Sequence, residues 1–230
     1  MDPAVCIVVG YGPGVGHGIA RAFAKAGASL LLLCRQPERH GPLLAELQGA
    51  LQSGGSAARL QAADAGDPEA LAAAIGAGLA ALPAQEGPVV LVYNAVAPTA
   101  APPTALSPAR LGADLQVDVV GALAAVQAVL PLVRQRGGAL LFTGGGMAHH
   151  PVAPLASIGI GKAALRSLVQ CLAQELAGQS PAVGVGMVTI MGQVAAGTAF
   201  DPTAIGEAFV ALQQRLARAE PGPLEELFQG

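Results

Sequence analysis

A glycine-rich turn near the start of the chain has the composition and spacing to bind a phosphate group. Its key members are Gly10, Gly14, Val15 and Gly16. The apolar, β-branched run 5–9 before it indicates a buried parallel strand, and the amphipathic run 19–27 after it indicates a helix. In such a unit the first glycine permits a tight turn, the second lets the backbone approach a pyrophosphate, and the third lets the helix pack on the strand. Because helix N-termini present free N–H groups to anions, the turn predicts a dinucleotide phosphate site.

A second group that could recognise a nucleotide is Arg35, which directly follows the apolar run 29–34. In a dinucleotide-binding fold this position lies near the adenosine ribose, where an acidic residue would bind the 2′-hydroxyl. The planar guanidinium suits a 2′-phosphate instead. Arg35 therefore favours NADP(H), with NAD(H) less favoured, and the open alternative is an arginine that is solvated in a loop.

The elements that must position these groups alternate along the chain. Apolar runs predict strands at 5–9, 29–34, 58–63, 88–93, 139–143, 183–190 and 224–228. Helical periodicity predicts helices at 19–27, 38–54, 108–136 (kinked near Pro131), 155–177 and 202–219, and a further helix that begins at Pro68 with Asp67 as its N-cap. This alternation predicts one α/β domain over residues 1–230, a Rossmann-type doubly wound parallel sheet flanked by helices on both faces.

Composition limits the possible partners and compartments. The formal net charge of −3 gives no reason to expect a nucleic-acid partner or an anionic membrane surface. The longest apolar run, 119–133, is short for a bilayer and predicts a buried helix. Because the three cysteines have no metal-binding or disulfide spacing and no charged segment precedes an apolar stretch at the start, we expect no metal site, no signal peptide and a cytoplasmic protein.

Several ordered matches resemble the short-chain dehydrogenase/reductase family over essentially the whole chain. The glycine turn fits the TGxxxGxG pattern of the family, with Val9 in place of the threonine. The remaining matches are Asp64, Asn94-Ala95, Asp118-Val119-Val120-Gly121 and Lys162-Ala163-Ala164-Leu165. The resemblance implies an oxidoreductase that uses a nicotinamide cofactor on a small-molecule substrate. It also implies a homodimer or homotetramer whose subunit faces are formed by the two long helices, 108–136 and 155–177.

The resemblance also implies which residues contact the cofactor beyond the turn. These positions are Asp64, Ala65, Asn94, Ala95, Lys162, Gly192 and Val194. In the family, the acid corresponding to Asp64 binds the adenine amino group, and the lysine corresponding to Lys162 binds the nicotinamide ribose. Gly192 and Val194 stand where the family contacts the nicotinamide.

The catalytic positions depart from the family pattern. Ile158 occupies the position of the tyrosine, four residues before Lys162. Gly145 occupies the position of the serine, and Asp118 that of the asparagine. The family tyrosine donates a proton to the substrate as hydride arrives, and a positioned acid contributes roughly 10²–10⁴ in rate. An ordinary ketone reductase with this sequence would need another proton source.

Three replacements for the tyrosine are open. His149 and His150 follow the fifth predicted strand on the side where the family binds substrate, and histidine can donate a proton near neutral pH. Asp118 could donate one if burial raised its pKa, although we expect it to form an ion pair with Lys162. An iminium or a conjugated acceptor would need no tyrosine at all.

A different class of function also fits the missing groups. A chain that keeps the fold without redox chemistry could be a non-redox catalyst, a sensor or an assembly partner. His17, at the start of the first predicted helix, is expected to be solvated rather than to contact phosphate.

Overall fold

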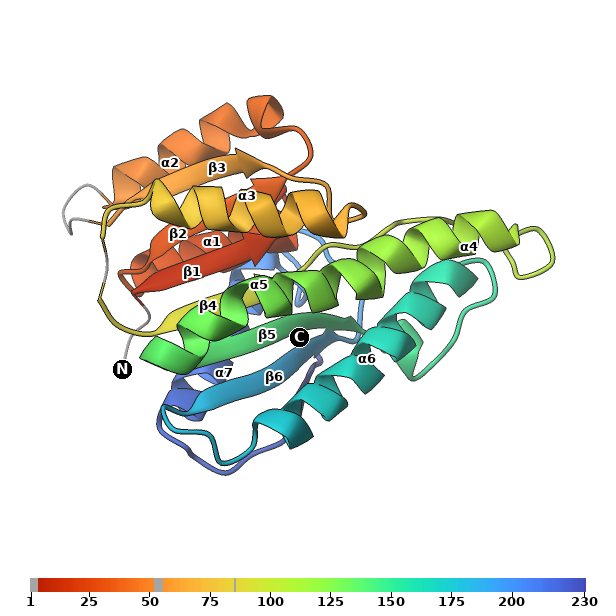
Figure 1. The fold of residues 1–230 in the computed structure, drawn as a ribbon. Coiled ribbons are helices and arrows are strands. Elements are labelled where there is room, and N and C mark those ends of the chain that lie inside the picture. The colour runs from red at the N-terminus through yellow and green to blue at the C-terminus, as the bar shows by residue number, and fades with distance from the viewer. Residues whose placement is uncertain (1–3, 52–55, 85) are drawn as a thin grey trace.

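Seven parallel strands form one sheet in the order β3-β2-β1-β4-β5-β6-β7 (Figure 1). The structure is a computed structural model that describes residues 4–51, 56–84 and 86–230. The strands are β1 (Val5–Val9), β2 (Ser29–Cys34), β3 (Ala58–Ala62), β4 (Val89–Tyr93), β5 (Gly138–Gly145), β6 (Val183–Ile190) and β7 (Glu225–Phe228). The strand order reverses between β1 and β4, and doubly wound sheets bind ligands at the carboxyl ends of the strands next to such a reversal.

Helices cover both faces of the sheet, as the sequence predicts. One face carries α1 (Val15–Lys25), α2 (Gly41–Leu51) and α7 (Pro202–Ala217). The other carries α3 (Pro68–Ala80), α4 (Pro108–Leu115), α5 (Gly121–Arg136) and α6 (Ala156–Leu176). The expected doubly wound α/β fold is therefore confirmed.

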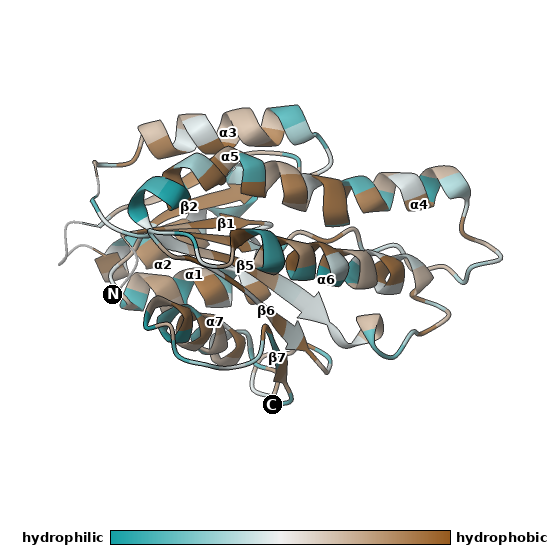
Figure 2. Cartoon of the chain, turned by 60° about the horizontal axis from the view of Figure 1, so that its bottom comes forward, coloured by the Kyte–Doolittle hydropathy of each residue, from teal (hydrophilic) through white to brown (hydrophobic). Residues whose placement is uncertain are grey.

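The apolar strands explain why both faces must be covered. In β1, Val5, Ile7 and Val9 belong to the core under α3, α5 and α6, whereas Cys6 and Val8 belong to the core under α1 and α7. Successive side chains of a strand point to opposite faces, so a continuous apolar run requires apolar partners on both sides. Figure 2 shows these apolar strands between the two helical layers.

Most predicted element bounds agree with the structure, and three helices differ. The helix predicted at 19–27 begins four residues earlier, as α1. The helix predicted at 38–54 is a short 3₁₀ helix, Pro37–His40, followed by α2, and its predicted end at Gly54 lies outside the described residues. The long helix predicted at 108–136 is interrupted by a π-helical segment, Gln116–Val120, and Pro131 lies within α5. π-helical segments frequently occur at functional sites, and this one contains Asp118.

Among the described residues, the run Pro108–Arg136 is long and apolar enough to cross a membrane by length and composition alone. In this structure the buried side chains of α5 pack in the core with those of β4, β5 and α3.

Candidate active site

Two glycines of the turn are required by packing. Gly10 has φ +87°, and a Cβ atom there would lie 2.4 Å from the backbone nitrogen of Ala95. A Cβ atom on Gly16 would lie 2.8 Å from the Gly10 carbonyl oxygen. The tight turn and the close approach of helix to strand therefore have the physical causes that the sequence predicts.

Gly14 has a different role, because no atom lies within 4 Å of the position its Cβ would take. It is the N-cap of α1 and supplies no capping side chain. Within the described part of the chain, no hydrogen bond uses the backbone N–H groups of Gly14, Val15 or Gly16. Open space in front of unpaired N–H groups at a helix N-terminus fits a diphosphate group.

Asn94 holds the turn in place from the neighbouring strand. Its side-chain nitrogen donates to the Gly10 carbonyl oxygen at 2.9 Å, and its side-chain oxygen accepts from the Thr143 hydroxyl at 2.9 Å. Asn94 therefore links β1 to β5 across the end of β4. This bracing was not predicted from the sequence, because it depends on the strand order.

A cleft of about 620 Å³ opens at the carboxyl ends of β1 to β4. Six predicted cofactor residues line it: Gly10, Arg35, Asp64, Ala65, Asn94 and Ala95. Arg35 is exposed and makes no ion pair or hydrogen bond with any described residue. A solvated guanidinium with no protein partner can bind a phosphate.

The other predicted cofactor residues lie outside this cleft but at the same end of the sheet. They are Gly14, Val15, Gly16, Lys162, Gly192 and Val194. Gly192 packs so closely on Phe200 that a Cβ atom would lie 2.2 Å from the ring. Val194 packs against the core under α1 and α7. Both follow β6, so the sequence places them correctly at the edge where the parallel strands end.

The expectation that His17 is solvated is wrong. His17 is buried, its Nδ1 lies 3.0 Å from the Tyr11 hydroxyl, and its Nε2 lies 3.3 Å from Glu46 on α2. Burial lowers the pKa of His17 below its ordinary value, although Glu46 opposes the shift. The tertiary contact between α1 and α2 decided this outcome, because the turn position alone would leave the ring in water.

The expected ion pair between Asp118 and Lys162 is not formed among the described residues. The Lys162 ammonium donates instead to the Thr143 carbonyl oxygen at 2.7 Å. Asp118 accepts from the Ala97 N–H through Oδ1 at 2.7 Å, and its buried Oδ2 has no hydrogen-bond partner in the described part of the chain. Oδ2 lies against the α6 backbone, where a Cβ atom on Gly161 would be 2.1 Å from it.

Burial controls the protonation of both groups. It lowers the pKa of Lys162 to about 8, although the charge of Asp118 raises it. It raises the pKa of Asp118 to about 6, although the Ala97 N–H and Lys162 lower it. Both groups therefore change charge within about one or two pH units of neutrality, which is the range where an acid or base is most useful in catalysis.

Sequence reasoning missed a polar network beside this pair. The buried Ser157 hydroxyl donates to Asp114 at 2.6 Å, and Arg110 lies 2.9 Å from the same carboxyl group. Burial alone would raise the pKa of Asp114, but hydrogen bonds from Ser157 and Thr99 and the charge of Arg110 hold it below its ordinary value. The network joins α4 to the start of α6, and only the contact between these helices reveals it.

The two candidate histidines have different surroundings. Both are exposed, and His149 Nε2 lies 2.8 Å from Glu225 on β7. The sequence does not indicate Glu225 as a partner of His149, because the two residues are distant in the chain and meet only when β7 joins the sheet. Neither histidine has a recorded contact with Lys162 or Asp118 among the described residues.

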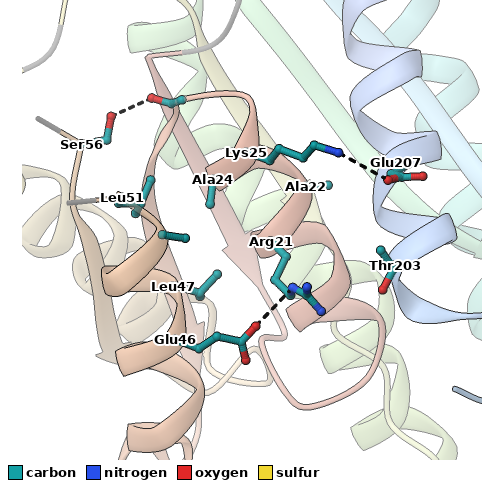
Figure 3. A pocket seen from close by; sticks show the side chains of 12 residues that line it. Arg21, Ala22, Ala24, Lys25, Glu46, Leu47, Leu51, Ser56, Thr203 and Glu207 are labelled. Carbon is teal, nitrogen blue, oxygen red and sulfur yellow. Dashed lines mark hydrogen bonds and ion pairs between the residues drawn. The ribbon is translucent and has the colours of Figure 1, made fainter. Parts of the chain in front are cut away.

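A second hollow, of about 590 Å³, lies between α1, α2 and α7 on the outside of the molecule (Figure 3). Its charged side chains pair with one another: Arg21 lies 3.3 Å from Glu46, and Lys25 lies 4.0 Å from Glu207. None of the predicted cofactor-binding or proton-donating residues lines this hollow, so we assign cofactor binding to the cleft at the carboxyl ends of β1 to β4.

The sheet order, the glycine turn and the lysine of α6 are those of a dinucleotide-binding fold. Comparison with known proteins identifies the family. Residues 4–199 match the family model for short chain dehydrogenases. The chain belongs to the short-chain dehydrogenase/reductase family. A Mycobacterium tuberculosis protein described as an uncharacterized oxidoreductase is 30% identical over 180 residues, a match that covers 76% of this chain and 65% of that protein.

Solved structures of the family share the whole architecture. A metagenomic short-chain oxidoreductase in complex with NADP has a TM-score of 0.79 at 27% identity, covering 97% of this chain and 95% of that one. A short-chain dehydrogenase from Rhodopseudomonas palustris has a TM-score of 0.81 at 21% identity, with 98% of each chain covered. An NADPH-bound oxidoreductase from Pseudomonas aeruginosa, described as containing an atypical catalytic center, has a TM-score of 0.83 at 20% identity, covering 98% and 96%.

Proposed function

We propose that this single-domain chain is an NADP(H)-dependent oxidoreductase that lacks the tyrosine acid of its family. The observation that carries the proposal is the set of N–H groups at Gly14, Val15 and Gly16 that form no hydrogen bond with any described residue, beside a cleft that contains Arg35. The 27%-identical relative solved with NADP supports the same cofactor. The bound nicotinamide would supply hydride to the substrate.

The residues of this chain would hold the two ends of the cofactor. The α1 N-terminus would bind the diphosphate, Arg35 the 2′-phosphate and Asp64 the adenine amino group. Asp64 already accepts a hydrogen bond from the Gly66 N–H at 2.8 Å, which orients its carboxyl group in the cleft. Lys162 would approach the nicotinamide ribose after releasing the Thr143 carbonyl.

Replacing Arg35 with alanine tests the cofactor assignment. Wild-type protein should bind NADPH more tightly than NADH, and Arg35→Ala should remove that preference. A charge-assisted hydrogen bond contributes about 1.5–3 kcal/mol, so NADPH affinity should fall roughly 10- to 150-fold while NADH affinity changes little. Fluorescence titration with both cofactors measures this. Failure of the wild-type protein to bind either cofactor would contradict the proposal.

Asp118 and Lys162 are the favoured proton source for an acceptor that needs one. Both are buried next to the strand end where the serine position, Gly145, lacks a side chain. When hydride is added to a conjugated acceptor, the resulting carbanion takes up one proton, whereas an iminium takes up none. The pair can supply this proton near neutral pH. His149 and His150 are the further candidates.

Replacing Asp118 with asparagine tests whether this carboxyl group titrates near neutral pH. The pKa of Asp118 rises from 3.8 in the unfolded chain to about 6 in the folded protein. The contribution of the protonated carboxyl group to the free energy of unfolding is therefore complete below pH 3.8 and is lost as the pH rises through 6. Asp118→Asn should therefore be more stable than wild type at pH 8, by about 1–3 kcal/mol, and the difference should shrink at pH 5. Urea unfolding at both pH values measures it. A difference that is independent of pH would exclude Asp118 as the acid.

A redox-silent role is the second candidate, and one observation favours it. Lys162 already donates to a backbone carbonyl, and neither Gly145 nor Ile158 carries a hydroxyl group. A protein of this kind would bind NADPH without transferring hydride from it. Absence of NADPH oxidation with ketones, conjugated acceptors and cyclic imines, combined with tight NADPH binding, would select this function.

We also propose that the chain forms a homodimer or homotetramer. The side chains of Val120, Leu123 and Ile160 are large, apolar and exposed on the layer that contains α5 and α6. Burying them against a second copy would remove apolar surface from water. Light scattering at micromolar concentration should give at least twice the chain mass, and a monomer would contradict the proposal.

A further inference from the structure

Glu225, the first residue of the edge strand β7, is an acidic side chain that the structure almost covers. Its side chain is only 14% exposed, although the strand lies at the end of the sheet next to β6 (Figure 2). A buried carboxylate requires hydrogen-bond donors, and the elements that supply these donors are linked through it.

Three donors from three different elements reach Glu225. His149 Nε2 and the Thr189 hydroxyl lie 2.8 and 2.6 Å from Oε1, and Arg166 Nε donates to Oε2 at 2.6 Å. Burial would raise the pKa of Glu225, but these hydrogen bonds and the charge of Arg166 hold it below its ordinary value. We call these four residues the Glu225 clasp.

The clasp connects β7 to the 3₁₀ helix Gly146–Ala148 and to α6, the helix that carries Lys162. His149 ends the short 3₁₀ helix Gly146–Ala148, which follows the serine position directly. That helix lies close to the end of β6, since a Cβ atom on Gly146 would be 3.4 Å from the Cα of Met191. Arg166 lies one helical turn after Lys162 on α6, so the two side chains project from the same side of the helix.

We propose that Glu225 is a positioning residue that fixes the loop 146–150 beside Lys162 by holding His149 Nε2. This inference rests on the proposed function for its catalytic meaning. A carboxylate at Nε2 fixes the tautomer of a neutral imidazole with the proton on Nε2, and it leaves Nδ1 as the nitrogen available to a substrate. The last strand of the chain thus becomes part of the active site without touching the cofactor cleft.

The matched pair Glu225→Gln and Glu226→Gln tests this role. Glu226 is the next residue of the same strand but pairs with Arg215 on α7 at 3.0 Å, so its variant alters β7 without altering the clasp. In Glu225→Gln, amide exchange at His149 and His150, which both donate to the Gly146 carbonyl, should accelerate about tenfold or more. Nitrogen-15 spectra should show the fixed Nε2–H tautomer of His149 in wild type and its loss in this variant. Glu226→Gln should resemble wild type in both measurements.

Two further measurements separate this inference from its alternatives. The amides of Met187 and Met191 donate to the carbonyl oxygens of Leu224 and Phe228, so their exchange rates report whether β7 remains paired with β6. NADPH affinity should be the same in wild type and in both variants. If wild-type protein did not bind NADPH, the proposed function would be contradicted, but the role of Glu225 in holding His149 would not. An unchanged His149 tautomer in Glu225→Gln would overturn the inference. Equal acceleration of the loop and the Met187 and Met191 amides would overturn it as well, because it would indicate a purely structural strand anchor.

Discussion

Gly14→Asp should weaken NADPH binding by at least about two orders of magnitude while the protein remains folded. The aspartate would enter the open space in front of the α1 N-terminus, where Gly14 has no neighbour within 4 Å of its Cβ position. Aspartate is among the preferred N-cap residues and complements the helix dipole, so the helix should be maintained. Its carboxylate would occupy the unpaired N–H groups and repel a diphosphate. Losing two charge-assisted hydrogen bonds, each worth about 1.5–3 kcal/mol, should weaken NADPH binding roughly 100-fold or more.

Gly14→Asn is the matched control, because it has nearly the same shape without the charge. It should weaken NADPH binding less than the aspartate does, and the gap should narrow as salt screens the repulsion. Cofactor titration together with thermal unfolding measures both effects. If Gly14→Asp bound NADPH as wild type does, the diphosphate would not lie at this turn.

The double variant Gly145→Ser, Ile158→Tyr should acquire carbonyl reductase activity. Gly145 has an extended backbone, and a Cβ atom there would lie 3.4 Å from the stem of Lys162, so a serine fits with a small adjustment. Ile158 lies one helical turn before Lys162, so a tyrosine there would return the proton donor to the side of α6 that carries the lysine. Since a positioned acid contributes roughly 10²–10⁴ in rate, NADPH oxidation with simple ketones should rise by at least about 10² over wild type.

The variant Gly145→Ser, Ile158→Phe separates the hydroxyl group from the ring that carries it. It should bind NADPH as well as the tyrosine variant and remain inactive toward ketones. If the tyrosine variant bound NADPH but showed no gain over the phenylalanine variant, then the missing acid would not be what limits this site.

The places in the fold of the proposed cofactor residues could be predicted because these residues are close together or next to strands in the sequence. Gly10, Gly14 and Gly16 lie in one turn, and Arg35 directly follows a strand, so parallel alternation alone brings them to one edge of the sheet. The catalytic half could not be predicted to the same depth. The orientation of Lys162 toward Thr143 and the unpaired oxygen of Asp118 depend on how α5, α6 and β5 approach one another.

By itself, the sequence determined the parallel alternation of strands and helices, the glycine-rich turn between the first strand and helix, and the absence of a serine and a tyrosine at the catalytic positions of the family. These features follow from apolar periodicity and from single residue types, which act over a few positions of the chain. Only the tertiary structure decided that His17 is buried beside Glu46 of α2, that Asp118 and Lys162 form no ion pair, and that Glu225 contacts His149. Each of these depends on contacts between elements distant in sequence, where burial and hydrogen bonding outweigh what the local sequence favours.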